Sequence, residues 1–153
     1  MVMVAAFALL GCSGGSAATD GSEHSGGTPS DESAVTTATV AGKTFIVHSI
    51  KRDGVQQPVD PAMPPRLVFS AAHLTSDTRC NGGGGDFRIV DNTLAMMSRD
   101  GSNLMLCSGA IGAQEAALND LLFGEPTGTA IAIKVDGPTV TLSRGGLVVS
   151  ATE

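Results

Sequence analysis

Apolar residues in the second part of the chain come in short runs, several of which alternate with polar residues, and this pattern predicts β-strands. Turn signals such as Asp53-Gly54 and Asp136-Gly137 separate the runs. Asp91-Asn92 lies between two runs and indicates a hairpin. The apolar runs occupy residues 44–50, 67–74, 87–90, 93–97, 104–107, 131–135, 140–142 and 147–149.

One stretch has helical spacing. Between residues 108 and 123 the larger apolar residues fall broadly on one helix face, and Gly124 with Pro126 ends the helix. The residues of that face are Ile111, Leu118, Leu121 and Leu122. Many short strands and one amphipathic helix predict a mainly β (α+β) fold, in which a small antiparallel β-barrel or curled sheet is covered by one α-helix.

Two further segments are expected to be loops. Residues 58–65 contain four prolines, which exclude a helix or a central strand and favour an extended surface loop. Gly82–Gly85 lacks the Lys-Ser/Thr ending and the parallel-sheet context of a phosphate-binding loop. We expect it to be a loop that uses positive φ, with Asn81 bonding turn backbone.

The beginning of the chain differs in composition from the rest. The apolar run Val2–Leu10 is too short to span a bilayer, and Leu9-Leu10-Gly11-Cys12 resembles the lipobox of bacterial lipoprotein signal peptides. The resemblance implies cleavage before Cys12 and a lipid on its sulfur, although no Lys or Arg precedes Cys12. The alternative is a cytosolic protein with an apolar terminus and a free thiol.

We therefore expect three regions. Residues 1–11 form a lipoprotein signal peptide, and residues 12–39 form the lipidated Cys12 and a flexible acidic Gly/Ser/Thr tether. Residues 40–153 form one folded domain. His24 lies in the tether and is expected to be a solvated polar residue.

Charge and composition exclude some partners. The formal net charge is −6, the basic residues are scattered, and there is no Trp or Tyr to stack on bases or sugars. We expect no nucleic-acid partner and no cofactor. The expected partners are a membrane, through the lipid on Cys12, and an unidentified envelope protein or small ligand. The protein is expected to be a monomer.

Apart from Cys12 the chain has one pair of cysteines, Cys80 and Cys107. In an exported protein such a pair predicts a structural disulfide. Catalytic or metal-binding thiols would need a CxxC motif or a nearby His, and the sequence shows neither. Two buried free thiols are a third reading. No metal site and no catalytic residue are expected.

Histidines and methionines are assigned ordinary roles. His48 and His73 lie in strand-like runs and are expected to be half-buried, each with one hydrogen bond. A Ser-His-Asp triad stays open because triads assemble in space, but no Gly-x-Ser-x-Gly motif favours one. Methionines expected to fill the core are Met96, Met97 and Met105.

Several weak motifs recur in a fixed order along the folded region. They are Gly42 with Phe45, Leu67 with Phe69, Cys80-Asn81 with Gly85 and Phe87, Met105 with Cys107, and Glu115 with Leu118 and Leu121. Their order and spacing resemble the META domain of HslJ-like bacterial heat-shock lipoproteins. Arg79, Phe87 and Asn103 depart from that pattern, which has Gly, Tyr and Thr there. The resemblance implies a compact antiparallel β fold with one helix, an envelope-stress or surface setting, and no established catalytic mechanism.

Three functions are compatible with these features. The favoured one is a lipid-anchored protein of the cell envelope that faces the extracytoplasmic side and has a non-catalytic binding or stress-related structural role. The second is a small-ligand or peptide binder with a pocket at the open end of a β-barrel. The third is an exported hydrolase that uses Ser with His48 or His73.

Overall fold

The structure, a computed structural model, describes residues 34–101, 105–126 and 128–153. The expected signal peptide, Cys12, His24 and the tether up to residue 33 lie outside the described residues. No helix in the described part of the chain is long and apolar enough to cross a membrane.

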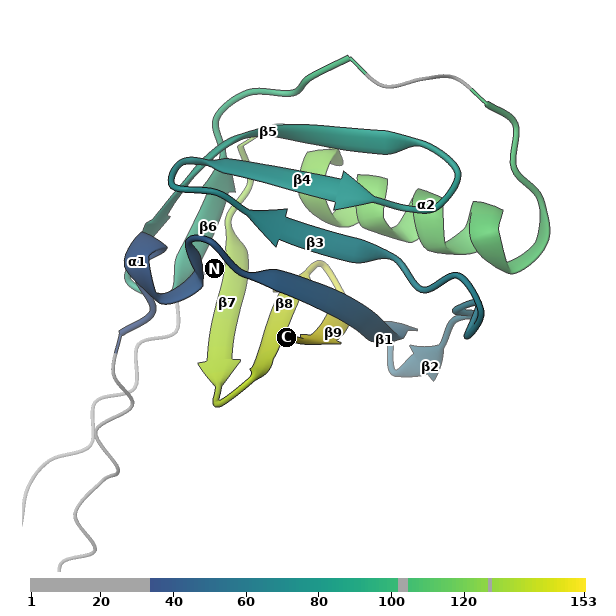
Figure 1. Cartoon of the computed structure of the whole chain (residues 1–153), viewed down its shortest axis with the longest axis horizontal. Coiled ribbons are helices and arrows are strands. Elements are labelled where there is room, and N and C mark those ends of the chain that lie inside the picture. The colour runs from purple at the N-terminus through teal and green to yellow at the C-terminus, as the bar shows by residue number, and fades with distance from the viewer. Residues whose placement is uncertain (1–33, 102–104, 127) are drawn as a thin grey trace, which may run out of the picture. The chain divides into compact units, whose positions relative to one another are not determined.

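In the described part of the chain nine strands form one sheet, which closes on itself (Figure 1). They are β1 (Thr44–Arg52), β2 (Val55–Gln56), β3 (Arg66–Phe69), β4 (His73–Asp77), β5 (Gly82–Val90), β6 (Thr93–Met96), β7 (Ile131–Asp136), β8 (Thr139–Arg144) and β9 (Leu147–Thr152). Strand β1 pairs with β3 and also with β9, so eight antiparallel strands close a barrel and β2 extends beside β1. The predicted small antiparallel barrel is confirmed.

The barrel interior is filled by side chains. Alternating residues of the strands point inward, as the period of two requires, and most are fully buried. The ring of Phe69 packs edge-to-face against Phe45 and Phe87, with centroid distances of 5.8 and 5.5 Å. The open-ended pocket expected of a barrel that binds a ligand inside is therefore occupied by the protein's own core.

Two helical segments cover opposite ends of the barrel (Figure 1). Helix α2 (Gly109–Phe123) confirms the predicted helix, and Leu118 and Leu121 are completely buried in the same core as the strands. The turn α1 (Thr37–Val40) lies at the other end. There Val35 and Val40 are buried, so packed structure begins before residue 40, where we placed the start of the domain.

Three strand-level predictions need correction. The run at 67–74 is two strands, β3 and β4, joined by a turn in which the Ser70 N–H donates to the His73 carbonyl at 2.8 Å. Residues Gly82–Gly85 lie inside strand β5 and none has a positive φ, so the expected glycine loop is wrong. Residues 105–107 form no strand.

The hairpin at Asp91-Asn92 is confirmed. Both residues have positive φ, 48° and 59°, as a tight turn between paired strands requires.

Among the methionines, Met96 is buried as expected. Met97 and Met105 are each 59% exposed, so their assignment to the core is wrong.

Candidate functional site

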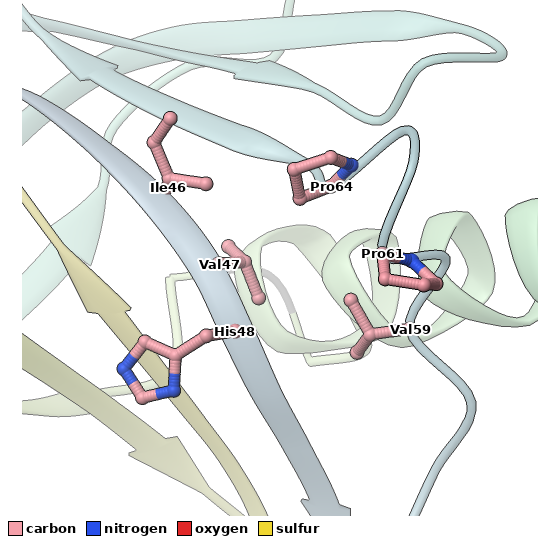
Figure 2. Close-up of a pocket in the computed structure, with 6 residues that line it drawn as sticks. All are labelled: Ile46, Val47, His48, Val59, Pro61 and Pro64. Atoms are coloured by element: carbon pink, nitrogen blue, oxygen red, sulfur yellow. The ribbon is translucent and has the colours of Figure 1, made fainter.

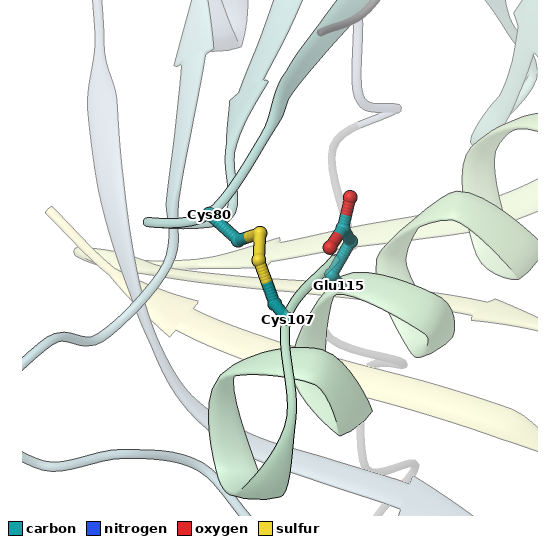
Figure 3. Close-up of side chains that lie close together, drawn as sticks. All are labelled: Cys80, Cys107 and Glu115. Atoms are coloured by element: carbon teal, nitrogen blue, oxygen red, sulfur yellow. A yellow bond between two sulfur atoms is a disulfide. The ribbon is translucent and has the colours of Figure 1, made fainter. Parts of the chain in front are cut away.

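Cys80 and Cys107 come together beside the first part of α2 (Figure 3). Their Cα atoms lie 6.2 Å apart, within the span of a disulfide, and the structure pairs the two cysteines as one. Cys80 follows β4 and Cys107 precedes α2, so a bridge joins the barrel wall to the helix. Glu115 of α2 is the third member of this group: one ligand atom from each residue lies within 4.8 Å of the others.

Asn81 organises the surroundings of this pair. Its Nδ2 donates to Oε1 of Glu115 at 2.6 Å, to the Met105 carbonyl at 2.9 Å and to Sγ of Cys80 at 3.3 Å. Its Oδ1 accepts from the Met105 N–H at 2.9 Å. Asn81 was expected to bond turn backbone, but its side chain instead bonds the main chain of the distant Met105 and connects the turn after β4 to α2 through Glu115.

Gln114, the neighbour of Glu115 on α2, is completely buried. Its Oε1 accepts from the Asp60 N–H at 3.1 Å, and its Nε2 donates to the carbonyls of Met63 at 3.1 Å and Thr78 at 2.9 Å. One side chain thus holds the proline-rich loop and the turn after β4 against the helix. A buried amide with its hydrogen bonds satisfied fixes both segments in place.

An apolar groove lies outside the barrel, between β1 and the proline-rich loop (Figure 2). Its volume is about 310 Å³. Figure 2 shows the strand residues on one side and the loop residues on the other. The residues that line it are Ile46, Val47, His48, Val59, Pro61 and Pro64. Of these six only His48 has a polar side chain, and it sits at an irregularity in the pairing of β1 with β9.

His73 lies between two carboxylates on the outer surface of β4 and β5. Its Nδ1 is 3.2 Å from Oδ1 of Asp86, which it faces across the strands, and its Nε2 is 3.1 Å from Oδ2 of Asp100. Both ring nitrogens therefore contact acids, and neither contacts a hydroxyl of the described residues. His48 is exposed and makes no hydrogen bond to a Ser or Thr side chain in the described part of the chain. Among the described residues, neither His48 nor His73 therefore forms the Ser-His pair that an exported hydrolase would need.

A second hollow, of about 200 Å³, lies beside His73. Glycines form its floor, because Gly82, Gly83 and Gly84 of β5 have no side chains, and Thr75 and Asp100 border it. Gly84 leaves space for the His73 contact, since a Cβ there would lie 3.0 Å from Nε2 of His73 and 3.1 Å from Oδ2 of Asp100. Gly84 and Gly85 of β5 thus make room for their neighbours, whereas a Cβ on Gly82 or Gly83 would meet nothing closer than 3.8 Å.

Comparison with models of protein families shows which family this chain belongs to. The family model described as META domain matches residues 38–152, which include all the described strands, helix α2 and all of α1 except its first residue. The chain belongs to the META domain family. The resemblance inferred from the motifs is confirmed, and the META match starts within α1.

Two solved structures share the fold of this META domain. An NMR structure of a protein from Burkholderia xenovorans has a TM-score of 0.59 and 20% sequence identity, over 82% of this chain and 95% of that one. A second NMR structure has a TM-score of 0.60 and 14% identity, over 77% of this chain and 94% of that one. No curated protein matched the chain. At these identities the likeness concerns the fold alone.

Glu115 is the residue of this META domain that the sequence does not connect to the cysteines. In the sequence it is part of the helix motif only. A Cys followed eight residues later by a Glu, here Cys107 and Glu115, is no recognised metal or redox signature. The three residues Cys80, Cys107 and Glu115 come together because the turn after β4 places Cys80 beside the start of α2.

Proposed function

We propose that this protein is a lipid-anchored META-domain protein of the cell envelope, held on the extracytoplasmic side by a lipid on Cys12. Its role in this proposal is non-catalytic: it binds a partner or gives physical support under envelope stress. The observation that carries the proposal is the 6.2 Å Cα separation of Cys80 and Cys107. Paired cysteines at this distance suit an oxidising compartment outside the cytoplasm.

The sequence around Cys12 supports the anchor. A short apolar run followed by Leu9-Leu10-Gly11-Cys12 is the pattern that lipoprotein processing uses, and two or more acyl chains on one cysteine suffice for stable membrane attachment. The described part of the chain has no membrane-spanning helix. Membrane association of the protein therefore tests the lipid on Cys12 directly.

The test is membrane fractionation of the full chain. Cys12→Ala should move the protein from the membrane to the soluble fraction and abolish labelling by a fatty acid. Ser13→Ala, a change of similar size beside the expected lipid site, should leave the distribution unchanged. Membrane association of Cys12→Ala equal to that of the unchanged chain would overturn the anchor.

Two observations support a role without turnover. The barrel interior is filled by side chains such as Phe45, Phe69 and Phe87. Both ring nitrogens of His73 face carboxylates, so among the described residues His73 has no hydroxyl positioned for activation as a nucleophile.

A second candidate function is the binding of a small uncharged ligand in the groove beside β1. The groove volume of about 310 Å³ lies at the lower end of the range for ligand sites, and its lining is almost entirely apolar. These properties fit a compact apolar molecule better than a peptide. Neutral aromatic fragments should shift the NMR amide signals of Ile46 and Val59.

Ile46→Lys, which places a charge at the rim of the groove, should remove these shifts. Val55→Lys is the matched control, because Val55 is 64% exposed on β2 and does not line the groove. Shifts that are absent in the unchanged chain, or that survive Ile46→Lys, would rule this function out.

A further inference from the structure

The group formed by Cys80, Cys107 and Glu115 has the composition of a metal site. One sulfur from each cysteine and one carboxylate oxygen of Glu115 all lie within 4.8 Å of one another, and all three residues are partly exposed (Figure 3). They come from the turn after β4, the segment before α2, and α2 itself. Two thiolates and a carboxylate are ligands that Zn²⁺ accepts, with a water molecule as the fourth.

The third ligand, Glu115, is positioned by Asn81. Asn81 is only 7% exposed, and its Nδ2 holds Oε1 of Glu115 at 2.6 Å. The N–H and carbonyl of Met105, both at 2.9 Å, hold the Asn81 side chain in turn. A carboxylate oriented by such a partner is the usual arrangement around protein-bound metals, because the partner fixes the ligand before the ion arrives.

The Met105 carbonyl also lies close to the sulfurs. It is 3.7 Å from Sγ of Cys80 and 3.8 Å from Sγ of Cys107. An oxygen near both sulfurs makes their surroundings polar, which suits a bound cation better than an apolar enclosure would.

The spacing of the cysteines suits a bound ion as well as a disulfide. Two sulfurs bound to one tetrahedral Zn²⁺ at about 2.3 Å lie about 3.8 Å apart. The Cα separation of 6.2 Å allows the sulfurs to reach this distance by rotation of the two side chains, without movement of the backbone. Metal binding and the disulfide are then mutually exclusive states of one site.

We propose that Cys80, Cys107 and Glu115 bind Zn²⁺ when the two cysteines are reduced. A phosphine or a dithiol supplies two electrons that break the S–S bond; the phosphine becomes its oxide by taking oxygen from water, or the dithiol becomes a disulfide. The two sulfurs take up two protons to form thiols. Binding of Zn²⁺ then forms two Zn–S bonds and releases two protons. The bound ion keeps the sulfurs apart and prevents their reoxidation.

This inference goes beyond the proposed envelope role and does not depend on the lipid on Cys12. The test uses the full chain with Cys12→Ala, so that Cys80 and Cys107 are its only thiols. After reduction with a phosphine, the chain is titrated with Zn²⁺, and with Co²⁺ to record the absorption of thiolate-bound cobalt. We expect one equivalent of metal to bind, the Co²⁺–thiolate absorption to appear, and the oxidised chain to bind none.

Glu115→Gln should weaken Zn²⁺ binding by about 10-fold or more, since loss of a ligand costs at least as much as loss of an orienting partner. Glu153→Gln is the matched control: Glu153 pairs with Lys43 at 2.9 Å, away from the cysteines, and its loss should leave the affinity unchanged. Circular dichroism follows the fold throughout. A reduced chain that unfolds and regains its fold with Zn²⁺ would support the proposal.

The proposal is overturned if the folded, reduced chain binds no Zn²⁺. It is also overturned if Glu115→Gln and Glu153→Gln bind the ion equally well, or if reduction unfolds the chain and Zn²⁺ does not restore it.

Discussion

Nδ2 of Asn81 donates a hydrogen bond of 2.6 Å to Oε1 of Glu115, across 34 residues of sequence. The bond joins the turn after β4 to helix α2 at the point where the two cysteines meet. Asn81 is nearly buried, so loss of its Nδ2 donor leaves the Glu115 carboxylate and the Met105 carbonyl without their shared partner.

Asn81→Asp should destabilise the domain by about 2 to 3 kcal/mol, measured as the free energy of unfolding in urea. Aspartate has nearly the same shape but replaces the donor with an oxygen, which then faces the Glu115 carboxylate. The control is Asn92→Asp, because Oδ1 of Asn92 accepts from the Val35 N–H at 2.5 Å and aspartate keeps that acceptor. Equal losses in the two variants would contradict this role for Asn81.

Gln114→Leu should cost about 3 kcal/mol of stability. The substitution keeps the volume of the side chain but leaves the Asp60 N–H and the carbonyls of Met63 and Thr78 without their partner. Gln56→Leu, made at an exposed glutamine of β2, should change the stability by no more than about 0.5 kcal/mol. A Gln114→Leu domain as stable as the unchanged one would mean that water replaces these bonds.

Gly85→Ala should destabilise the domain by about 3 kcal/mol through overpacking. A Cβ on Gly85 would lie 2.0 Å from the Ser98 carbonyl oxygen, and that segment is held by the bond from the Met97 N–H to the Asp86 carbonyl at 2.7 Å. Gly101→Ala is the control, since a Cβ there meets nothing within 4 Å. Thermal unfolding of both variants checks the difference.

Removal of both Cys80 and Cys107 by alanine substitution should cost about 3.5 kcal/mol, the chain-entropy value for a loop closed over 27 residues. The unchanged chain should lose the same amount on reduction in a metal-free buffer, whereas the double variant should not respond to the reductant. Thiol labelling of the folded chain should leave both cysteines unmodified until reduction. Labelling before reduction would show that the pair is not oxidised.

The sequence predicted much of this fold because several signals are local. Asp91-Asn92 gave the hairpin between β5 and β6, since these residue types adopt positive φ easily. The helical spacing of the apolar residues between 108 and 123 predicted α2. The boundary between β3 and β4 was missed because Ser70-Ala71-Ala72 contains no Gly, Pro, Asn or Asp to indicate a turn.

The errors at β5 and at the site have a different cause. A glycine can allow a positive φ, or it can allow a neighbouring segment to approach closely. The position of Ser98 shows that Gly85 has the second role, and the sequence does not indicate it. The connection of Glu115 to the cysteines likewise depends on contacts between distant segments. Met105 is held by its main chain, which bonds Asn81, while its side chain is exposed, an arrangement that its apolar side chain does not indicate.

Pairing of β1 with β9 brings together strands from the two extremes of the folded region. A growing polypeptide cannot complete this domain until residues 147–152 have been made, because β9 is the strand that closes the ring against β1. Among the described strands, closure leaves the short β2 at an edge, which limits edge-to-edge aggregation.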